Sequence, residues 1–353
     1  MSGYRGNMKA AKLYGANDVR VVDCAVPEIG DDEILLKTKA AAICGSDLRM
    51  IGNGYKGVDK EHPLTLGHEI TGIIEAAGKN VKGYEKGMRV AIAPNIGCGI
   101  CDWCVSGDTH LCPDYTAFGI NMDGGFAEYV RIPRNAVIQG NIMILDDSMP
   151  LDAAALIEPA SCVLNGQLLT GIRLNDKVLV IGAGPIGIMH GQLARALGAA
   201  KVYIRDISQE RMKQGVGLIP GAEAIQEEDL EAAAKRLTGG RGFDVTITAC
   251  PSPSAQADAL KITGMNGRIL YFGGLPAGKD AVTLSTNLIH YKQLSIHGST
   301  RGNVRHFRDV AKMAATGTLN LAKLISRRYP ITEFADAVDY AKRAEGLKTA
   351  IVF

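Results

Sequence analysis

The stretch Val178-Leu-Val-Ile-Gly-Ala-Gly-Pro-Ile-Gly187 decides the fold of the second half of the chain. Four apolar residues predict a short strand, the glycines that follow have the G-x-G-x-x-G spacing, and a helical pattern runs on through Ala196. A turn of this kind lets the backbone approach a pyrophosphate at a helix N-terminus. The segment therefore predicts a dinucleotide-binding turn, and a tight strand–helix turn without a ligand is the alternative. The candidate cofactor contacts are Gly182, Gly184, Pro185, Ile186 and Gly187.

An acidic residue follows where the ribose of such a cofactor would lie. Asp206 ends the next predicted strand, 19 residues after Gly187. A carboxylate in this place accepts hydrogen bonds from the adenosine ribose and favours NAD over NADP. Arg205 and Arg211 keep NADP open, because either could meet a 2′-phosphate, with Arg211 retained as a candidate cofactor contact. A solvated surface charge is the other explanation for both arginines.

The pattern of apolar residues differs between the two halves of the chain. From residue 178 onward strands alternate with helices, which implies a parallel sheet with crossover helices. The strands are predicted at 178–181, 201–205, 245–248, 268–272 and 294–297. Up to about residue 155, short apolar runs are separated by glycine and proline turn signals, as in an irregular β-barrel. These runs lie at 9–13, 19–22, 34–38, 70–75, 89–93 and 126–130.

The composition excludes several classes of protein. Of 353 residues, 46% are hydrophobic and 22% charged, which excludes intrinsic disorder. A net charge of +2 gives no reason to expect nucleic acid or an anionic membrane as the main partner. No apolar run approaches the roughly 18 residues of a membrane span. Residues 1–7 are polar and lack the apolar stretch of a secretory signal, so we expect a cytoplasmic protein.

Four of the eight cysteines fall within 15 residues. Cys98, Cys101, Cys104 and Cys112 have the spacing C-x2-C-x2-C-x7-C, which brings four thiolates within reach of one tetrahedral ion. Because a closed four-thiolate site leaves no position for water or substrate, it indicates a structural zinc. Unligated thiols and an iron–sulfur cluster are the alternatives. We expect a zinc-bound lobe over about residues 95–115 that stiffens the chain and does no chemistry.

A second group of candidate ligands is spread through the strand-rich region. Cys44 opens the segment Cys-Gly-Ser-Asp, His68 and Glu69 are adjacent, and Glu158 comes just before the nucleotide-binding half. One thiolate, one imidazole and one carboxylate can hold zinc with a fourth position open, as catalysis requires. Taken singly, each has a structural alternative: a small buried residue, a core histidine and an acid at a helix N-terminus.

Together these elements resemble the zinc-containing medium-chain dehydrogenase/reductase superfamily, over essentially the whole chain from Met8. The matching elements, in order, are Cys44-Gly-Ser-Asp, Gly67-His-Glu69, the Cys98–Cys112 lobe, Glu158-Pro159 and Gly182–Gly187. Within the superfamily the chain looks most like the polyol branch, which includes sorbitol and galactitol-phosphate dehydrogenases. Glu158 carries this similarity, since it stands where the alcohol dehydrogenases of the superfamily have a cysteine ligand.

The resemblance implies an α/β architecture of two domains with the active site in the cleft between them. A GroES-like β-barrel catalytic domain would comprise residues 1–155 and 290–353, and a Rossmann nucleotide-binding domain with a doubly wound parallel sheet would comprise residues 156–289. In the family, the residues matching Cys44 and His68 bind the catalytic zinc, and those matching Glu69 and Glu158 bind it directly or hold its water. The residue matching Ser46 begins the proton path, so Ser46 and Glu69 are the candidate catalytic residues.

Substrate contacts are expected from Arg301 and from aromatic residues that follow the cysteine lobe. Arg301 matches a substrate-binding arginine of sorbitol dehydrogenases, although Gly302 replaces the aromatic residue found beside it there. A structural ion pair is the alternative for Arg301. Phe118 and Tyr115 follow the cysteine lobe and are candidates for a wall of the substrate site, with a core aromatic as the alternative for Phe118.

The expected function is zinc-dependent hydride transfer between NAD and a secondary alcohol of a polyol or sugar alcohol, free or phosphorylated. Alternatives within the superfamily are a threonine-type or simple alcohol dehydrogenase and an NADP-preferring polyol or ketose reductase. A non-catalytic nucleotide-binding protein and a redox or zinc sensor acting through the cysteine lobe are alternatives from other classes. We expect two zinc ions per chain, one catalytic and one structural. We also expect a small-molecule substrate, no nucleic-acid or membrane partner, and a homodimer or homotetramer.

Overall fold

The computed structural model describes residues 6–353, so residues 1–5 of the polar start lie outside the description. The chain forms two compact units, one of Met1–Ser161 with Gly302–Phe353 and one of Cys162–Arg301. The first unit is discontinuous because the C-terminal strand returns to its sheet. The predicted α/β class, with a β-barrel and a parallel-sheet domain, is confirmed. No helix of the described residues is long and apolar enough to cross a membrane.

The first unit is built on a seven-stranded sheet of order β10-β6-β5-β3-β18-β17, with β9 also paired to β3. Its strands are β3 (Ile34–Ala42), β5 (Glu69–Ala77), β6 (Arg89–Ile92), β9 (Tyr129–Ile132), β10 (Ile142–Ile144), β17 (Ile325–Pro330) and β18 (Lys348–Val352). A three-stranded sheet of order β2-β1-β4 accompanies it, formed by β1 (Asn7–Gly15), β2 (Asp18–Ala25) and β4 (Leu64–Thr65). The short strands β7 (Asn95–Ile96) and β8 (Thr116–Ala117) pair beside the cysteine lobe.

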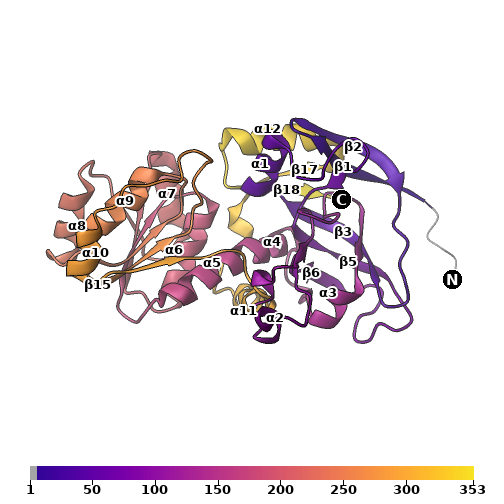
Figure 1. Cartoon of the computed structure of the whole chain (residues 1–353), viewed down its shortest axis with the longest axis horizontal. Helices are drawn as coiled ribbons and strands as arrows, with labels where there is room; N and C mark the ends of the chain where they lie inside the picture. The colour runs from indigo at the N-terminus through magenta and orange to yellow at the C-terminus, as the bar shows by residue number, and fades with distance from the viewer. Residues whose placement is uncertain (1–5) are drawn as a thin grey trace. The chain divides into compact units, whose positions relative to one another are not determined.

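Alternating apolar residues of β3, β5 and β6 fill the core of this unit. Ile34, Leu36, Ile70 and Ile74 are all buried and belong to one cluster, as expected of strands with one face turned inward. Helix α12 (Phe334–Arg343) packs against β17 and β18 (Figure 1). The other helices of the unit are α1 (Gly45–Asn53), α2 (Asp102–Val105), α3 (Arg134–Gln139), α4 (Leu151–Ala155) and α11 (Val304–Ala315).

One predicted strand is displaced. The apolar run at 126–130 predicts a strand, but β9 begins only at Tyr129. The Phe126 carbonyl accepts a hydrogen bond from the Ala11 amide, and Ala127 forms an isolated bridge with Ala10, so this part of the chain pairs with β1. Pairing with β3 starts at Tyr129, opposite Lys37.

The second unit contains a six-stranded parallel sheet of order β13-β12-β11-β14-β15-β16. Its strands are β11 (Lys177–Ile181), β12 (Lys201–Arg205), β13 (Glu223–Ala224), β14 (Phe243–Thr248), β15 (Thr263–Tyr271) and β16 (Ser295–Gly298). Its helices are α6 (Pro185–Ala196), α7 (Gln209–Leu218), α8 (Leu230–Thr238), α9 (Pro253–Ile262) and α10 (Thr286–Lys292).

The ends of the two units differ from the boundaries expected at 155 and 290. Strand β16 follows residue 290 but pairs with β15, from Ser295 opposite Arg268 to Gly298 opposite Tyr271. Helix α5 (Ile157–Thr170) contains the other break, which falls after Ser161. Hydrogen bonding in the sheet, which the local sequence pattern does not show, therefore keeps residues 295–298 with the second unit, which ends at Arg301.

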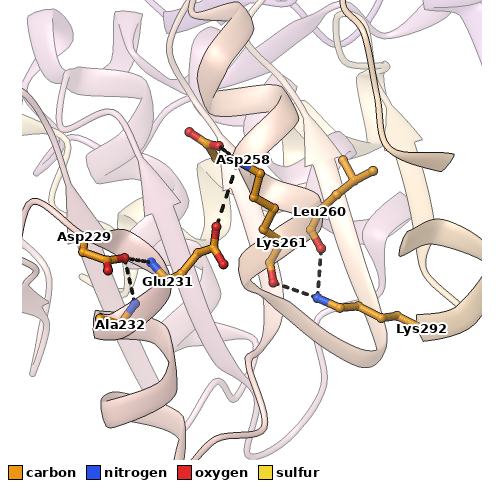
Figure 2. Close-up of polar contacts among 7 residues, drawn as sticks. All are labelled: Asp229, Glu231, Ala232, Asp258, Leu260, Lys261 and Lys292. Atoms are coloured by element: carbon orange, nitrogen blue, oxygen red, sulfur yellow. Dashed lines mark hydrogen bonds and ion pairs between the residues drawn. The ribbon is translucent and has the colours of Figure 1, made fainter. Parts of the chain in front are cut away.

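Side chains fix the helix ends in this second unit (Figure 2). Asp229 caps α8, since its Oδ1 accepts hydrogen bonds from the amides of Glu231 and Ala232, each at 3.0 Å. At the C-terminal end of α9, the Lys292 ammonium donates to the carbonyls of Leu260 (3.1 Å) and Lys261 (2.7 Å). These contacts satisfy backbone groups that a helix end leaves unpaired.

Candidate functional site

The strand register of the first unit brings two predicted ligand segments together. Strands β3 and β5 are antiparallel, with Ala42 opposite Glu69. Cys44 lies just beyond the end of β3, at the N-cap of α1, and His68 lies just before the start of β5. The two side chains, 24 positions apart in sequence, therefore meet at one end of a strand pair.

A glycine permits the close approach of the His68 segment to its neighbours. Gly67 has a φ of +94°, and a Cβ at this position would lie 2.9 Å from the ring of the buried Phe126. Another residue type would be strained by the backbone conformation and would clash with the ring. This position therefore requires glycine.

Three potential ligand atoms converge at this point. One each from Cys44, His68 and Glu69 lie within 4.8 Å of one another. The donors are a soft sulfur, an imidazole nitrogen and a carboxylate oxygen, a set that suits zinc with an open fourth position. Oε2 of Glu69 is buried and has no hydrogen-bond partner among the described residues, as expected of an atom reserved for a ligand. The residues therefore fit a catalytic zinc ion.

Asp47 contacts both ligand segments. Its Oδ2 accepts a hydrogen bond of 2.8 Å from the Cys44 amide, and its Oδ1 lies 3.5 Å from Nδ1 of His68. The Asp47 side chain is completely buried. A carboxylate beside the second ring nitrogen orients a metal-binding histidine. Ser46 lies on the other side of the ring, with its Oγ 3.4 Å from Nε2 of His68.

Burial and charge set the protonation of these groups. Burial opposes protonation of His68, yet Asp47 and the sulfur of Cys44 raise the His68 pKa well above that of a free imidazole. Burial alone would raise the pKa of Cys44, but the neighbouring His68 brings this pKa below that of a free thiol. The two groups therefore favour a thiolate–imidazolium pair, in which the thiolate is the form of cysteine that binds metals and a bound metal would displace the imidazole proton.

The Glu69 carboxylate is paired with a lysine from the C-terminal strand. Oε1 of Glu69 lies 2.5 Å from the ammonium of Lys348, and both side chains are buried. Burial raises the pKa of Glu69 to about 7, with Lys348 opposing this shift and the nearby Glu158 adding to it. Glu158 itself lies buried in the first turn of α5, as its alternative assignment as a helix N-terminal acid predicts. It is not among the three residues whose ligand atoms converge.

The four predicted cysteines of the lobe also converge. The sulfur atoms of Cys98, Cys101, Cys104 and Cys112 lie within 4.8 Å of one another. Sγ of Cys98 and Sγ of Cys104 are 3.9 Å apart, close to the roughly 3.8 Å of a tetrahedron with Zn–S bonds of about 2.3 Å. The Cys98 sulfur also accepts a hydrogen bond from the Cys101 amide, and such amides lower the Cys98 pKa to about 7. The four residues therefore fit a structural zinc ion.

In the second unit, the glycine-rich turn has the geometry that its spacing predicts. Gly182 has a φ of +110°, and a Cβ on Gly187 would lie 1.7 Å from the carbonyl oxygen of Gly182. Gly184 caps α6, whose first residue is Pro185, and a Cβ on Gly184 would meet no atom within 4 Å. Open space at the N-cap of a helix is what a bound pyrophosphate needs.

Asp206 is fixed at the end of β12. Its Oδ2 accepts a hydrogen bond of 2.7 Å from the amide of Ala183, and its Oδ1 accepts one of 2.8 Å from the amide of Ser208. Arg205 donates to the carbonyl of Ile225 at 3.2 Å. The Arg211 amide donates to the Oγ of Ser208 at the start of α7.

Two of the expected substrate contacts, Phe118 and Arg301, have different outcomes. Phe118 is completely buried in the barrel core with Ile70 and Ile92, so its ring contacts core residues, and the structure corrects the expectation of a substrate contact. Arg301 has a φ of +54°, an uncommon conformation for a residue with a side chain. Arg301 is the last residue of the second unit. Its role as a substrate-binding residue stays a prediction.

Two residues of the metal centre were not assigned a role from the sequence. Asp47 lies in the Cys-Gly-Ser-Asp segment, and its position three residues after Cys44 was the available signal. Lys348 stands 279 positions from Glu69. The only sequence feature that could have indicated Lys348 is its position just before the apolar run of the last strand.

Comparisons with known proteins agree with this geometry. Residues 30–142 match the family description "Alcohol dehydrogenase GroES-like domain", and residues 185–316 match "Zinc-binding dehydrogenase". Sorbitol dehydrogenase of Bombyx mori is 32% identical to this chain over 97% of both proteins. L-threonine 3-dehydrogenase of Bacillus licheniformis is 31% identical over 98% of this chain and 99% of its own length.

Solved structures show the same fold. The galactitol-1-phosphate dehydrogenase of Escherichia coli is 30% identical, with a TM-score of 0.88 over 98% of this chain and 100% of that protein. Two further structures of this fold, 29% and 27% identical to this chain, contain NADP and NADH, respectively.

Proposed function

The chain belongs to the zinc-binding dehydrogenase family of alcohol and polyol oxidoreductases, and from this premise we propose that it oxidises a secondary hydroxyl of a polyol or sugar alcohol with NAD. The observation that carries the proposal is the convergence of Cys44, His68 and Glu69, with Asp47 behind the histidine. Glu158, whose charge raises the pKa of Glu69, stands where the alcohol dehydrogenases of the superfamily have a cysteine ligand, and this supports the polyol branch. The substrate can be free or phosphorylated.

The residues of the first unit have separate roles in this proposal. Cys44, His68 and Glu69 hold the catalytic zinc ion, with Glu158 as a further candidate ligand or water-holding residue. When bound, zinc polarises the substrate hydroxyl and lowers its pKa. Ser46 would accept the hydroxyl proton by hydrogen bond and pass its own proton on towards the cofactor ribose and solvent, and its Oγ, 3.4 Å from Nε2 of His68, lies beside a proposed zinc ligand as this role requires. The four cysteines of the lobe hold the second, structural zinc ion.

Asp206 supports NAD as the cofactor. Its carboxylate is held by two backbone amides at the end of β12 and would repel a 2′-phosphate. The turn at Gly182, Gly184 and Gly187 would hold and orient the cofactor, whose nicotinamide ring would supply the hydride acceptor. NADP stays open through Arg205 and Arg211.

A second candidate substrate is L-threonine, because a threonine dehydrogenase is as similar to this chain as a sorbitol dehydrogenase is. A panel of polyols, sugar-alcohol phosphates, simple alcohols and L-threonine, assayed with NAD and NADP in parallel, separates the candidates. We expect the highest kcat/KM with a polyol or its phosphate and NAD. Turnover of threonine alone would replace the proposal by the second candidate. Light scattering on the same sample tests the predicted homodimer or homotetramer.

A further inference from the structure

Lys348 touches both segments that carry the proposed zinc ligands. Its ammonium donates to Oε1 of Glu69 at 2.5 Å and to the carbonyl of Ile43 at 2.9 Å. Ile43 directly precedes Cys44, and Glu69 directly follows His68. A single cation from the last strand therefore connects the two ligand segments.

The surroundings of this lysine make the contact specific. Lys348 is 6% exposed, and Glu69 is completely buried. A buried ammonium is costly unless acceptors surround it, and both acceptors here belong to the ligand segments. The backbone of β18 is itself fixed, because it pairs with β3 from Ala350 opposite Ala42 onward.

The two oxygens of the Glu69 carboxylate have different partners. Oε1 is held by Lys348, whereas Oε2 is buried and has no hydrogen-bond partner among residues 6–353. An unpaired buried carboxylate oxygen is unfavourable in the free protein. The ion pair with Lys348 thus holds the carboxylate in an orientation that only a ligand at Oε2 would satisfy.

We propose that Lys348 is a positioning residue of the metal centre, which presents Oε2 of Glu69 to the ion and fixes the spacing between the Cys44 and His68 segments. The inference rests on the proposed function in one respect, namely that Cys44, His68 and Glu69 are zinc ligands. The positive charge of Lys348 also offsets one of the two negative charges that Cys44 and Glu69 bring to the site. Loss of the lysine should therefore loosen one zinc ion and leave the four-cysteine site unchanged.

Zinc release from the full-length, zinc-loaded protein to a chromogenic chelator tests this proposal. We expect two zinc ions in the wild type. In K348Q one of them should bind about 10–100-fold more weakly, the usual loss of affinity when a partner behind a metal ligand is removed, and leave correspondingly faster, whereas the other should leave at the wild-type rate. The matched control is R268Q, which removes another buried cation, paired with Asp176 at 2.7 Å in the second unit. R268Q should lower the melting temperature and leave both release rates unchanged.

K348R keeps the test decisive if K348Q does not fold. Its planar guanidinium cannot reproduce the geometry of an ammonium at both acceptors, so release of the same zinc should fall between the rates of wild type and K348Q. Release at the wild-type rate from folded K348Q, or from K348R where K348Q does not fold, would overturn the inference. A wild-type protein that binds one zinc ion only would instead overturn the proposed catalytic site.

Discussion

Two buried histidines, one in each unit, show how neighbouring groups decide what the same side chain can do. His68 is 7% exposed and has Asp47 at 3.5 Å on one side of its ring and Ser46 at 3.4 Å on the other. Its pKa lies well above that of a free imidazole, although burial opposes this shift. The carboxylate and the thiolate of Cys44 outweigh burial here.

Among residues 6–353, no charged group near His190 raises its pKa. It is completely buried in α6, where Nδ1 lies 3.2 Å from the amide nitrogen of Gln167 and the ring makes an edge contact with Phe272. Burial lowers its pKa to about 3. Burial by itself therefore gives a neutral core histidine, and charged partners are needed to build a site.

The largest expected difference between the two histidines is in catalysis. In His68→Ala the protein should lose one of its two zinc ions and turnover should fall by about a thousand-fold or more, because a metal supplies several kcal/mol of transition-state stabilisation. His190→Gln, the control, should keep both zinc ions and most of the activity. Metal analysis and steady-state kinetics on both proteins measure this. A His68→Ala protein that retains two zinc ions would contradict the assignment.

A smaller effect is expected from the carboxylate behind His68. Asp47→Asn keeps the side-chain shape and removes its charge, so zinc affinity or kcat/KM should fall by about 10–100-fold. Asp206→Asn provides the contrast, because its effect should appear in the KM for NAD and not in zinc content. Equal zinc affinity in Asp47→Asn and wild type would show that the aspartate does not support the histidine.

The smallest expected effect is on stability at acid pH. His190 is neutral in the folded protein down to about pH 3, whereas an unfolded histidine takes up a proton near pH 6.5. The contribution of neutral His190 to the free energy of unfolding is thus fully present above pH 6.5 and is lost as the pH falls towards 3. Between pH 7 and 5.5 the loss is about 1.2 kcal/mol. Urea unfolding at both pH values should show a free energy of unfolding that changes less favourably in the wild type than in His190→Gln by this amount, since the other titrating groups are common to both proteins. An equal change in the two proteins would refute the assignment.

Local patterns were sufficient to predict the parts of the chain whose residues are close in sequence. The four cysteines of the lobe converge as their spacing predicts, and the turn at Gly182–Gly187 follows a parallel strand as expected. In both cases a short loop can bring the residues together in few ways. The spacing of these residues in the sequence then determines most of their arrangement in space.

Contacts between residues that are far apart in sequence could not be predicted without knowing how the strands pair in the sheet. Cys44 and His68 meet because β3 and β5 are paired with Ala42 opposite Glu69, a register that the sequence does not specify. Lys348 reaches Glu69 only because β18 adds to β3 from the far end of the chain. The sequence left both a pocket wall and the core open for Phe118, because its burial depends on packing with Ile70 and Ile92, which lie far from it in the chain.

Anomalous scattering at the zinc absorption edge, from crystals grown with zinc, tests the central claim most directly. The account predicts two peaks per chain, one at the four cysteine sulfurs and one within about 2.0–2.3 Å of Sγ of Cys44 and a ring nitrogen of His68. A single peak in the cysteine lobe, with clear density for metal-free Cys44 and His68, would contradict it.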